Sequence, residues 1–252
     1  MELRKFSHLN LARKFTAYFA TLLVEFILVI STFEFLSRNK TWTIDLILGQ
    51  MFKANVITFF YVPIFLLLIS SQGYTNNYLI ILKYSYVEDW WKGKIRIFLK
   101  ETLTYFLLTY TIPLIVTIIL NSKYLKVLSY KEFIFIVEYL IIAFLLLVIY
   151  GTVYLIVLTI IKKTIAAYVT GVLVSFIDFI FIYIFKTGNF SGITMGMLIN
   201  FLMSYSLSPK RQIFLFGIYL SYFLLLFGVL NIIMTNTLKK IDVCRGDKKS
   251  EN

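Results

Sequence analysis

Apolar residues gather along the chain in long runs that short polar and basic segments separate. A helix needs about 20 mostly apolar residues to cross a bilayer. Six runs meet that length, and they cover approximately residues 16–36, 54–71, 97–120, 133–160, 165–185 and 212–235. The pattern predicts an all-α, polytopic integral membrane protein with a single transmembrane domain over residues 1–236. Residues 237–252 have no apolar face and are expected to form a disordered polar tail.

Composition and charge agree with this prediction and assign a side to each loop. Of the 252 residues, 60% are hydrophobic and only 15% are charged, which is too few polar groups for a soluble protein. The net charge of +12 comes from basic residues between the apolar runs, so no nucleic-acid partner is expected. Placing both termini inside puts 16 of the 25 lysines and arginines on the cytoplasmic side. The positive-inside rule therefore predicts a multi-pass protein of the cell membrane with both termini cytoplasmic.

One apolar segment, residues 191–211, does not fit the six-span count. It is apolar for only about a dozen residues, too short to cross, and it ends near Pro209. We interpret it as a re-entrant or interfacial segment on the outer side, with a plain hydrophobic loop as the alternative. Pro63 and Pro113 interrupt the second and third runs and are expected to kink those helices.

An acid within a membrane span is costly and requires either a partner or a role. Glu25 lies near the middle of the first run, where Tyr18, Thr21 and Thr32 share its face at helical spacing. This polar stripe is a candidate substrate path. The alternative is a protonated glutamic acid that is hydrogen-bonded to a neighbouring helix.

The fifth run carries small residues at a spacing of four. Ala167, Gly171 and Ser175 share one face, and Asp178 follows on nearly the same face. Small residues in this register let two helices approach closely, so we predict a helix contact within the chain or across a dimer. The pattern leaves open whether Asp178 and Glu25 are functional or structural.

Several kinds of enzyme and metal site are excluded by counting residues. His8 is the single histidine, so the chain cannot assemble a zinc helix or a histidine-dependent nucleophile. Cys244 is the single cysteine, which rules out an intramolecular disulfide. Gly93 and Lys94 lack the rest of a phosphate-binding loop. We therefore expect no metal, no cofactor and no ATP hydrolysis in this chain itself.

The segment "KYSYVEDWWKGK", residues 83–94, is the most charged and aromatic part of the chain. The stretch "NNYLIILKY", residues 76–84, overlaps its start and places Tyr78 and Leu82 on one face of a short amphipathic helix at the inner surface. Trp90 and Trp91 are expected at the headgroup level, where Lys94 and its basic neighbours meet anionic lipids. These three residues are therefore predicted to anchor the segment at the membrane surface.

The same segment resembles the loop between spans two and three of ABC type-2 exporter permeases. The similarity is to the small six-span permeases of Gram-positive bacteria that accompany peptide and bacteriocin export or immunity. The matching positions are a basic residue, a serine, a tryptophan pair and a lysine, here Lys83, Ser85, Trp90, Trp91 and Lys94. The six-span layout, the basic N-terminal segment and the outer segment before span six extend a looser resemblance over most of the chain.

Two positions depart from the family pattern. Gln72 stands in place of an acid and Tyr86 in place of an arginine, so an ion pair between these positions is not inferred.

The resemblance implies a permease subunit of an ATP-driven exporter that moves a hydrophobic or cationic peptide, a toxin or an antibiotic. ATP and Mg²⁺ would be bound by a separate ATP-binding subunit, and a second permease subunit would complete a homodimer or heterodimer. The segment implied to couple to the ATP-binding subunit contains Tyr78, Leu82, Lys83, Tyr84 and Ser85.

Two other classes of function remain open. An ion-coupled secondary carrier would use Glu25 or Asp178 as its ion site. The sequence shows no pair of broken helices in corresponding halves, which disfavours that class. A membrane immunity or assembly protein without transport activity is the other alternative.

Overall fold

The computed structural model describes residues 2–39, 43–70, 87–120, 129–184 and 194–247. Within these residues all regular secondary structure is helical, and six helical stretches are long and apolar enough to cross a membrane. They are Lys14–Arg38, Ile44–Ser70, Glu88–Leu120, Tyr130–Ile161, Thr164–Ile182 and Pro209–Leu238. The prediction of an all-α membrane protein with six spanning helices is confirmed at this level.

Single α-helices form the first, fourth, fifth and sixth spans, whereas the second and third are composite. The single helices are α1 (Glu2–Asn39), α8 (Tyr130–Ile161), α9 (Thr164–Ile184) and α11 (Pro209–Asp247). The second span comprises α2 (Ile44–Met51), α3 (Ala54–Val56), the π-helical turn η1 (Ile57–Tyr61) and α4 (Val62–Ser70). The third comprises α6 (Val87–Phe106), the π-helical turn η3 (Leu107–Thr111) and α7 (Ile112–Leu120). Before the sixth lie α10 (Met195–Met203) and the 3₁₀ turn η4 (Ser204–Ser206).

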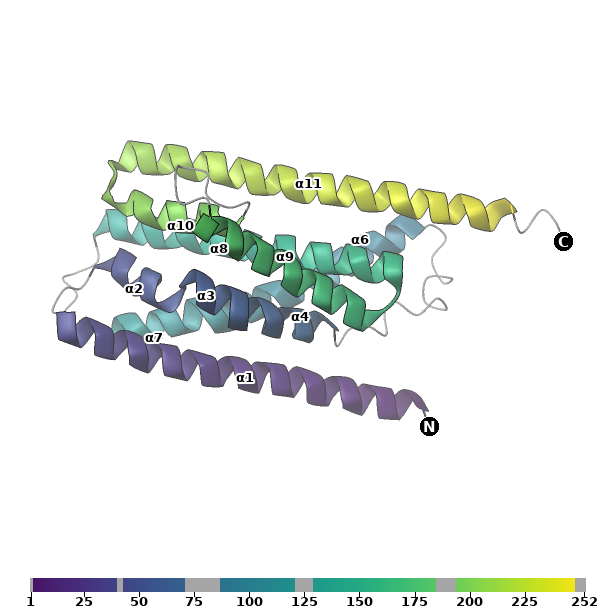
Figure 1. Ribbon diagram of the computed structural model, residues 1–252, viewed down its shortest axis with the longest axis horizontal. Helices are drawn as coiled ribbons and strands as arrows, with labels where there is room; N and C mark the ends of the chain where they lie inside the picture. The colour runs from purple at the N-terminus through teal and green to yellow at the C-terminus, as the bar shows by residue number, and fades with distance from the viewer. Residues whose placement is uncertain (1, 40–42, 71–86, 121–128, 185–193, 248–252) are drawn as a thin grey trace.

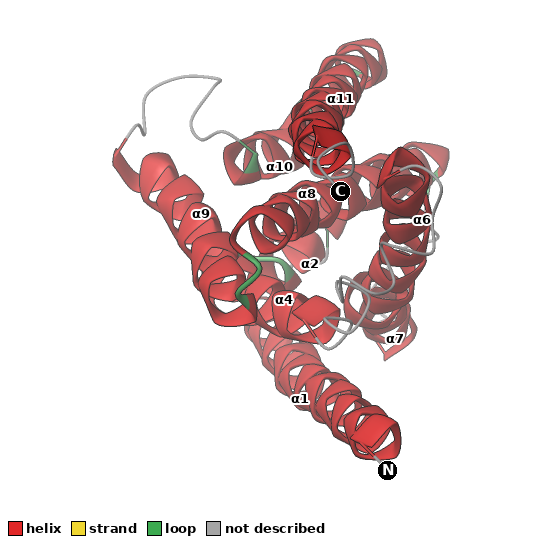
Figure 2. Ribbon diagram, turned by 90° about the vertical axis from the view of Figure 1, so that its right-hand side faces the viewer, coloured by secondary structure: helices red, strands yellow, loops and turns green. Residues whose placement is uncertain are grey.

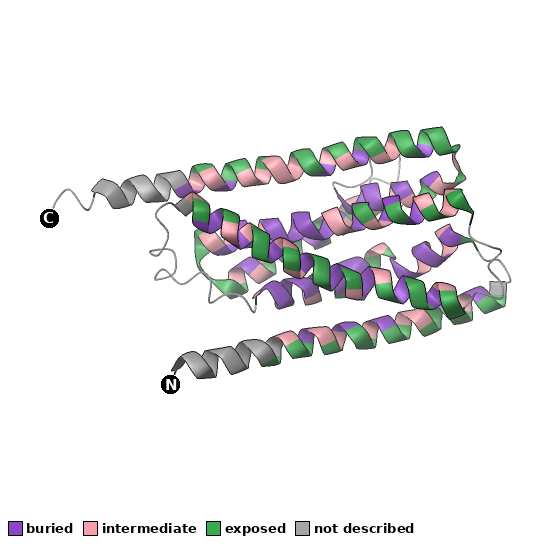
Figure 3. Cartoon of the chain, turned by 180° about the vertical axis from the view of Figure 1, so that it is seen from behind, coloured by how far each residue is buried: buried purple, intermediate pink, exposed green. Residues whose placement is uncertain are grey.

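Helix α8 forms the centre of the bundle and packs against α4, α6, α9, α10 and α11 (Figure 2). Helices α1 and α11 lie at the periphery and turn exposed apolar faces outward (Figure 3), as lipid contact requires. Both termini lie at one end of the bundle (Figure 1), which we call the terminal end. The opposite end, where α8 and α11 begin, is called the distal end.

The second span begins ten residues earlier than the sequence predicted, at Ile44 instead of residue 54. Residues Ile44, Ile47, Leu48 and Met51 recur at helical spacing and are fully buried. Polar neighbours in this segment concealed that short apolar face from a count of consecutive apolar residues. The helix then breaks at Phe52 before the chain continues into the bundle.

The polar tail also differs from the prediction. Helix α11 continues to Asp247, so residues 237–247 are helical instead of disordered. Leucine, lysine and arginine in this segment are good helix formers and can extend the preceding span. Residues 248–252 lie outside the described part of the chain.

Each of the two spans that contain a predicted proline kink has a π-helical turn just before that proline. Turn η1 precedes Pro63, and turn η3 precedes Pro113. A proline removes one N–H donor and crowds the carbonyl four residues earlier, so the ladder widens there. Tyr61 in η1 and Tyr110 in η3 have ring centroids 5.2 Å apart, which shows that the two widened turns meet inside the bundle.

The small-residue face of α9 packs inside the chain. Ala167 and Ser175 are fully buried, and a β-carbon on Gly171 would lie 2.6 Å from the Leu66 side chain of α4. The same atom would lie 3.6 Å from Cβ of Tyr154 in α8. These residues therefore contact α4 and α8 within the same chain.

Gly171→Leu should lower the free energy of unfolding by about 1–3 kcal/mol, since the added side chain overpacks this contact. Gly217 in α11 is the matched control, because a β-carbon there would have no neighbour within 4 Å. Gly217→Leu should change stability by less than about 0.5 kcal/mol. Thermal unfolding of the two variants in the same detergent measures the difference. Equal melting behaviour of both variants would contradict the packing of Gly171 against Leu66.

Candidate functional site

Helix α10 begins in the interior of the bundle, next to Tyr150 of α8 and Asp178 of α9. The Asp178 carboxylate accepts hydrogen bonds from the backbone N–H groups of Thr194 at 3.1 Å and Met195 at 2.7 Å. It also accepts from the hydroxyls of Tyr150, at 2.7 Å, and Thr194. Tyr150 lies about 27 Å along α8 from Glu132, at 1.5 Å per residue. The start of α10 is therefore far from the distal end.

The carboxylate of Asp178 accepts hydrogen bonds from N–H groups at the start of α10, which would otherwise have no acceptor. The first N–H groups of a helix have no partner within the helix, and lipid offers none. Asp178 supplies the acceptor from a neighbouring helix, and its negative charge also complements the positive end of the helix dipole. This geometry fits the re-entrant interpretation of residues 191–211 and gives Asp178 a structural role.

The other end of α10 is fixed at the start of α8. Lys131 donates to the backbone carbonyl of Tyr205 at 2.9 Å, and the Tyr205 hydroxyl donates to Glu132 at 3.2 Å. Burial, together with the negative charge of Glu132, raises the pKa of Tyr205 to about 12, so the phenol remains a neutral donor. The segment Thr194 to Tyr205 is thus held at both ends.

The predicted polar stripe of α1 faces the bundle. Thr21, Glu25 and Thr32 are buried, and Tyr18 is half-buried, on the side that packs against α4, α7 and η3. Neither oxygen of the Glu25 carboxyl has a hydrogen-bond partner among the residues the structure describes. Glu138, another buried acid, accepts a 2.6 Å bond from the Gln212 amide. Glu25 therefore differs from the other two buried acids, Glu138 and Asp178.

Three tyrosines lie around Glu25, and the polar pattern of the sequence did not indicate them. The hydroxyl of Tyr61 interacts with the Glu25 carboxyl, and Tyr105 and Tyr110 lie within electrostatic range. The Tyr61 contact lies outside normal hydrogen-bond geometry, because the carboxyl oxygens and this hydroxyl each remain without a partner in the described part of the chain. Tyr105 donates to the Tyr61 carbonyl at 2.8 Å. The signal available in the sequence was a tyrosine within two or three residues of each span proline, at Tyr61 and Tyr110.

Trp90 and Trp91 lie inside the bundle instead of at a lipid-facing surface. Their exposed fractions are 3% and 2%, and the Trp91 indole N–H donates to Asn231 of α11 at 3.2 Å. Lys94 is also buried, with its Nζ 4.9 Å from the centroid of the Trp90 ring. The sequence predicted all three as surface anchors. The structure shows that Trp91 connects α6 to α11, because an amphipathic ring fits a helix contact as well as a headgroup layer.

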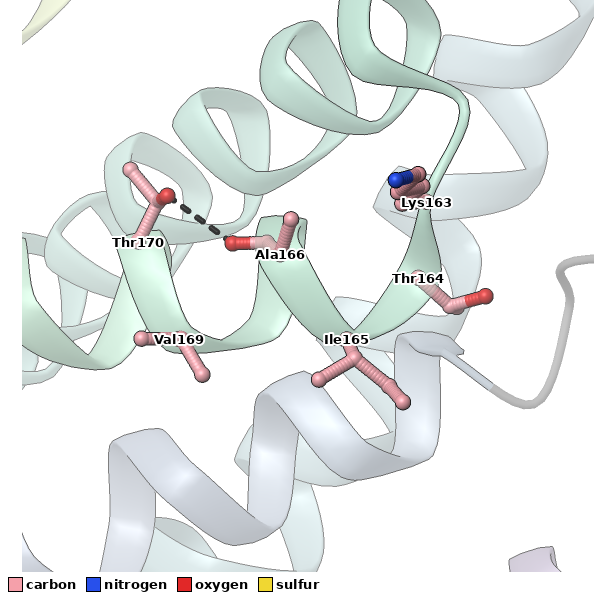
Figure 4. A pocket seen from close by; sticks show the side chains of 6 residues that line it. All are labelled: Lys163, Thr164, Ile165, Ala166, Val169 and Thr170. Atoms are coloured by element: carbon pink, nitrogen blue, oxygen red, sulfur yellow. Dashed lines mark hydrogen bonds between the residues drawn. The ribbon is translucent and has the colours of Figure 1, made fainter.

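The residues proposed to couple to an ATP-binding subunit, Tyr78, Leu82, Lys83, Tyr84 and Ser85, lie outside the described residues. A hollow lies at the start of α9, shown from close by in Figure 4. It is lined by Lys163, Thr164, Ile165, Ala166, Val169 and Thr170. Ile165 is 81% exposed, and the Thr170 hydroxyl donates to the Ala166 carbonyl of its own helix. Among the described residues, the hollow therefore has no set of polar groups that converge on one point.

The described residues contain no group of three or more histidine, cysteine, aspartate or glutamate side chains that could hold a metal ion. Comparisons of the chain with protein-family models, with curated proteins and with solved structures found no match. The geometry of α10 with Asp178, and of Glu25 with its tyrosines, is therefore the basis for a functional proposal.

Proposed function

We propose that the chain is a membrane-spanning permease subunit that moves its substrate across the bilayer. The observation that carries this proposal is helix α10, whose first turn begins inside the bundle beside Asp178. Non-helical backbone at membrane depth is tolerated where protein buries it or where it lines a water-filled cavity, and it is a feature of transporters. The break at Phe52 in the second span is a further irregularity of this kind.

The energy source we propose is ATP hydrolysed by a separate subunit. Support comes from the motif shared with ABC type-2 exporter permeases and from the position of α10 before span six, which agrees with the family layout. The terminal end of the bundle would then be cytoplasmic, and residues 76–86 would dock on the ATP-binding subunit. Through the bond between Trp91 and Asn231, motion at the start of α6 would pass to α11. The cargo would be a hydrophobic or cationic peptide, a toxin or an antibiotic.

Combining Tyr78→Ala with Leu82→Ala should release the ATP-binding subunit. Aromatic and aliphatic anchors provide most of the energy of a helix contact, so losing two should cost at least about 2 kcal/mol, a roughly 30-fold weaker affinity. Lys92→Ala is the matched control, because Lys92 is an exposed residue whose ion pair with Asp89 is local. The measurement is recovery of the ATP-binding subunit with the tagged chain after mild extraction. Equal recovery with the double variant and the control would argue against docking through this segment.

A second candidate is an ion-coupled carrier. Glu25 favours it, because a buried carboxyl without a hydrogen-bond partner among the described residues is available to bind an ion. Against it, the irregularities of the described residues do not correspond between the halves: the two π-helical turns and the break at Phe52 lie in the first half, and the interior start of α10 lies in the second. Carriers built from inverted repeats place such irregularities in corresponding positions of both halves.

A further inference from the structure

Glu25 is a buried acid near the middle of a spanning helix. Its residue is 5% exposed, and neither carboxyl oxygen has a hydrogen-bond partner among the described residues. An ionised carboxylate in such a place has a desolvation cost that only a cation or several donors can offset. The neutral, protonated acid avoids that cost.

The groups that face Glu25 are neutral. Tyr61 of η1, Tyr105 of α6 and Tyr110 of η3 present hydroxyls, and those of Tyr61 and Tyr110 have no hydrogen-bond partner in the described chain. Helices α4 and α7, which also pack against α1, contain no titratable residue. Helix α2 contributes Asp45, which lies at the distal end and interacts with Tyr205. No cation among the described residues balances a charge on Glu25.

A line of polar groups runs from Glu25 toward the terminal end, and its members lie within electrostatic range of one another. Tyr105 interacts with Glu25, with the Thr21 hydroxyl and with Tyr18. The Tyr18 hydroxyl in turn lies within electrostatic range of the Glu101 carboxylate. Glu101 forms a 2.7 Å ion pair with Lys14, in which both side chains are partly exposed. The line covers about 16 Å between Lys14 and Glu25, at 1.5 Å per residue of α1.

We propose that Glu25 is a proton-binding site inside the bundle and that it exchanges its proton with water at the terminal end along Tyr105, Tyr18 and the Lys14–Glu101 pair. A hydroxyl in this line accepts one proton and releases its own, and the proton that leaves Glu25 ends on a water molecule. The conformation described here is the proton-loaded one. The inference deepens the carrier candidate and rests on it only for the use of the proton in transport.

A proton fits this site better than a metal cation. Calcium and magnesium take six or more oxygen ligands. Around Glu25 the described residues offer its two carboxyl oxygens and the hydroxyls of Tyr61, Tyr105 and Tyr110, which are fewer than six oxygens. The Tyr61 carbonyl already accepts from Tyr105. A single proton on the carboxyl needs no further ligand.

Infrared difference spectroscopy of the purified full chain in lipid bilayers tests the proposal without ATP, partner or substrate. At neutral pH the unmodified chain should show the carbonyl stretch of a protonated carboxylic acid, and Glu25→Gln should lose this band. Glu34→Gln, which changes an exposed acid paired with Arg38, is the matched control and should keep it. Tyr18→Phe should keep the band. In D₂O the carboxyl proton exchanges for deuterium and the band shifts in frequency, and Tyr18→Phe should slow this exchange by about tenfold, equivalent to about 1.4 kcal/mol in the exchange barrier.

Three outcomes would overturn the proposal. The first is that the unmodified chain shows no band at neutral pH, and the second is that the band persists in Glu25→Gln. The third is that the band disappears when sodium replaces choline in the buffer, which would indicate a metal-cation site. If Glu25→Gln does not fold, Glu25→Asp retains an acid and should move the band in frequency; an unmoved band would again exclude Glu25. Because the spectra need no transport, they can fail while the permease proposal stands, and the reverse also holds.

Discussion

Asp178→Leu should lower the free energy of unfolding by about 2–6 kcal/mol. The substitution leaves the backbone N–H groups of Thr194 and Met195 without their acceptor, and each buried orphan donor costs about 1–3 kcal/mol. The hydroxyls of Tyr150 and Thr194 lose the same partner. With so large a loss, α10 should leave its place beside α8 and α9, or the chain should fail to fold.

A comparison with Asp178→Asn separates two contributions of Asp178 to stability, its hydrogen bonds to the first turn of α10 and its negative charge. Asparagine keeps one acceptor oxygen, so its loss of stability should be smaller than that of leucine. Glu34→Leu is the control at an exposed acid and should change stability by less than about 0.5 kcal/mol. Unfolding in denaturant, followed for the four chains in one detergent, ranks them. A leucine variant as stable as the unmodified chain would contradict the capping of α10 by Asp178.

Trp91→Ala should have the second large effect, a loss of about 3–5 kcal/mol, because the ring is buried between α6 and α11. Asn231→Ala removes only the hydrogen bond and should cost about 0.5–1.5 kcal/mol. In the double variant the two losses should not add, since the residues are direct partners. Thermal unfolding of the two single variants and the double variant gives the coupling energy.

The outcome for Trp91 also distinguishes two positions for the ring. A tryptophan at a lipid-facing surface would behave as a surface residue, and its replacement by alanine would change stability by less than about 0.5 kcal/mol. A loss that small, together with full additivity of Trp91→Ala and Asn231→Ala, would contradict the helix contact.

The six spans could be predicted from the sequence because length and apolarity alone decide whether a helix can cross a bilayer. The start of the second span could not be predicted, because Asp45 and Gln50 interrupt the run of apolar residues in Ile44–Met51. A count of consecutive apolar residues does not detect a helix that is apolar on one face only. The continuation of α11 to Asp247 was not predicted for a related reason. The polar residues after position 236 indicate that this segment is exposed to water, but an exposed segment can still be helical.

The candidate site was predictable only in part. The stripe containing Thr21 and Glu25 was visible because all its residues lie on one helix with a regular spacing. Tyr61 and Tyr105, which face Glu25, come from other helices, and only tertiary packing brings them there. Asp178 was expected at a helix contact, but its actual partners include backbone N–H groups of α10, which no side-chain pattern reveals.

The tryptophan pair shows a different limit. Trp90 and Trp91 have an apolar ring and one N–H donor, which suits both the headgroup layer and a polar contact between two helices. The sequence around them, rich in lysine, favoured the first environment. The acceptor in the helix contact, Asn231, lies 140 residues away from Trp91 in the chain.

The permease proposal is tested most directly by native mass spectrometry of the unmodified chain, extracted from its own membrane in a mild detergent. We predict a complex of two permease subunits, either two copies or one copy with a related subunit, and two ATP-binding subunits. Addition of excess detergent should dissociate it into its components. Recovery of the chain alone, with no ATP-binding subunit under the mildest extraction that solubilises it, would contradict the proposal of an ATP-driven exporter and favour a carrier.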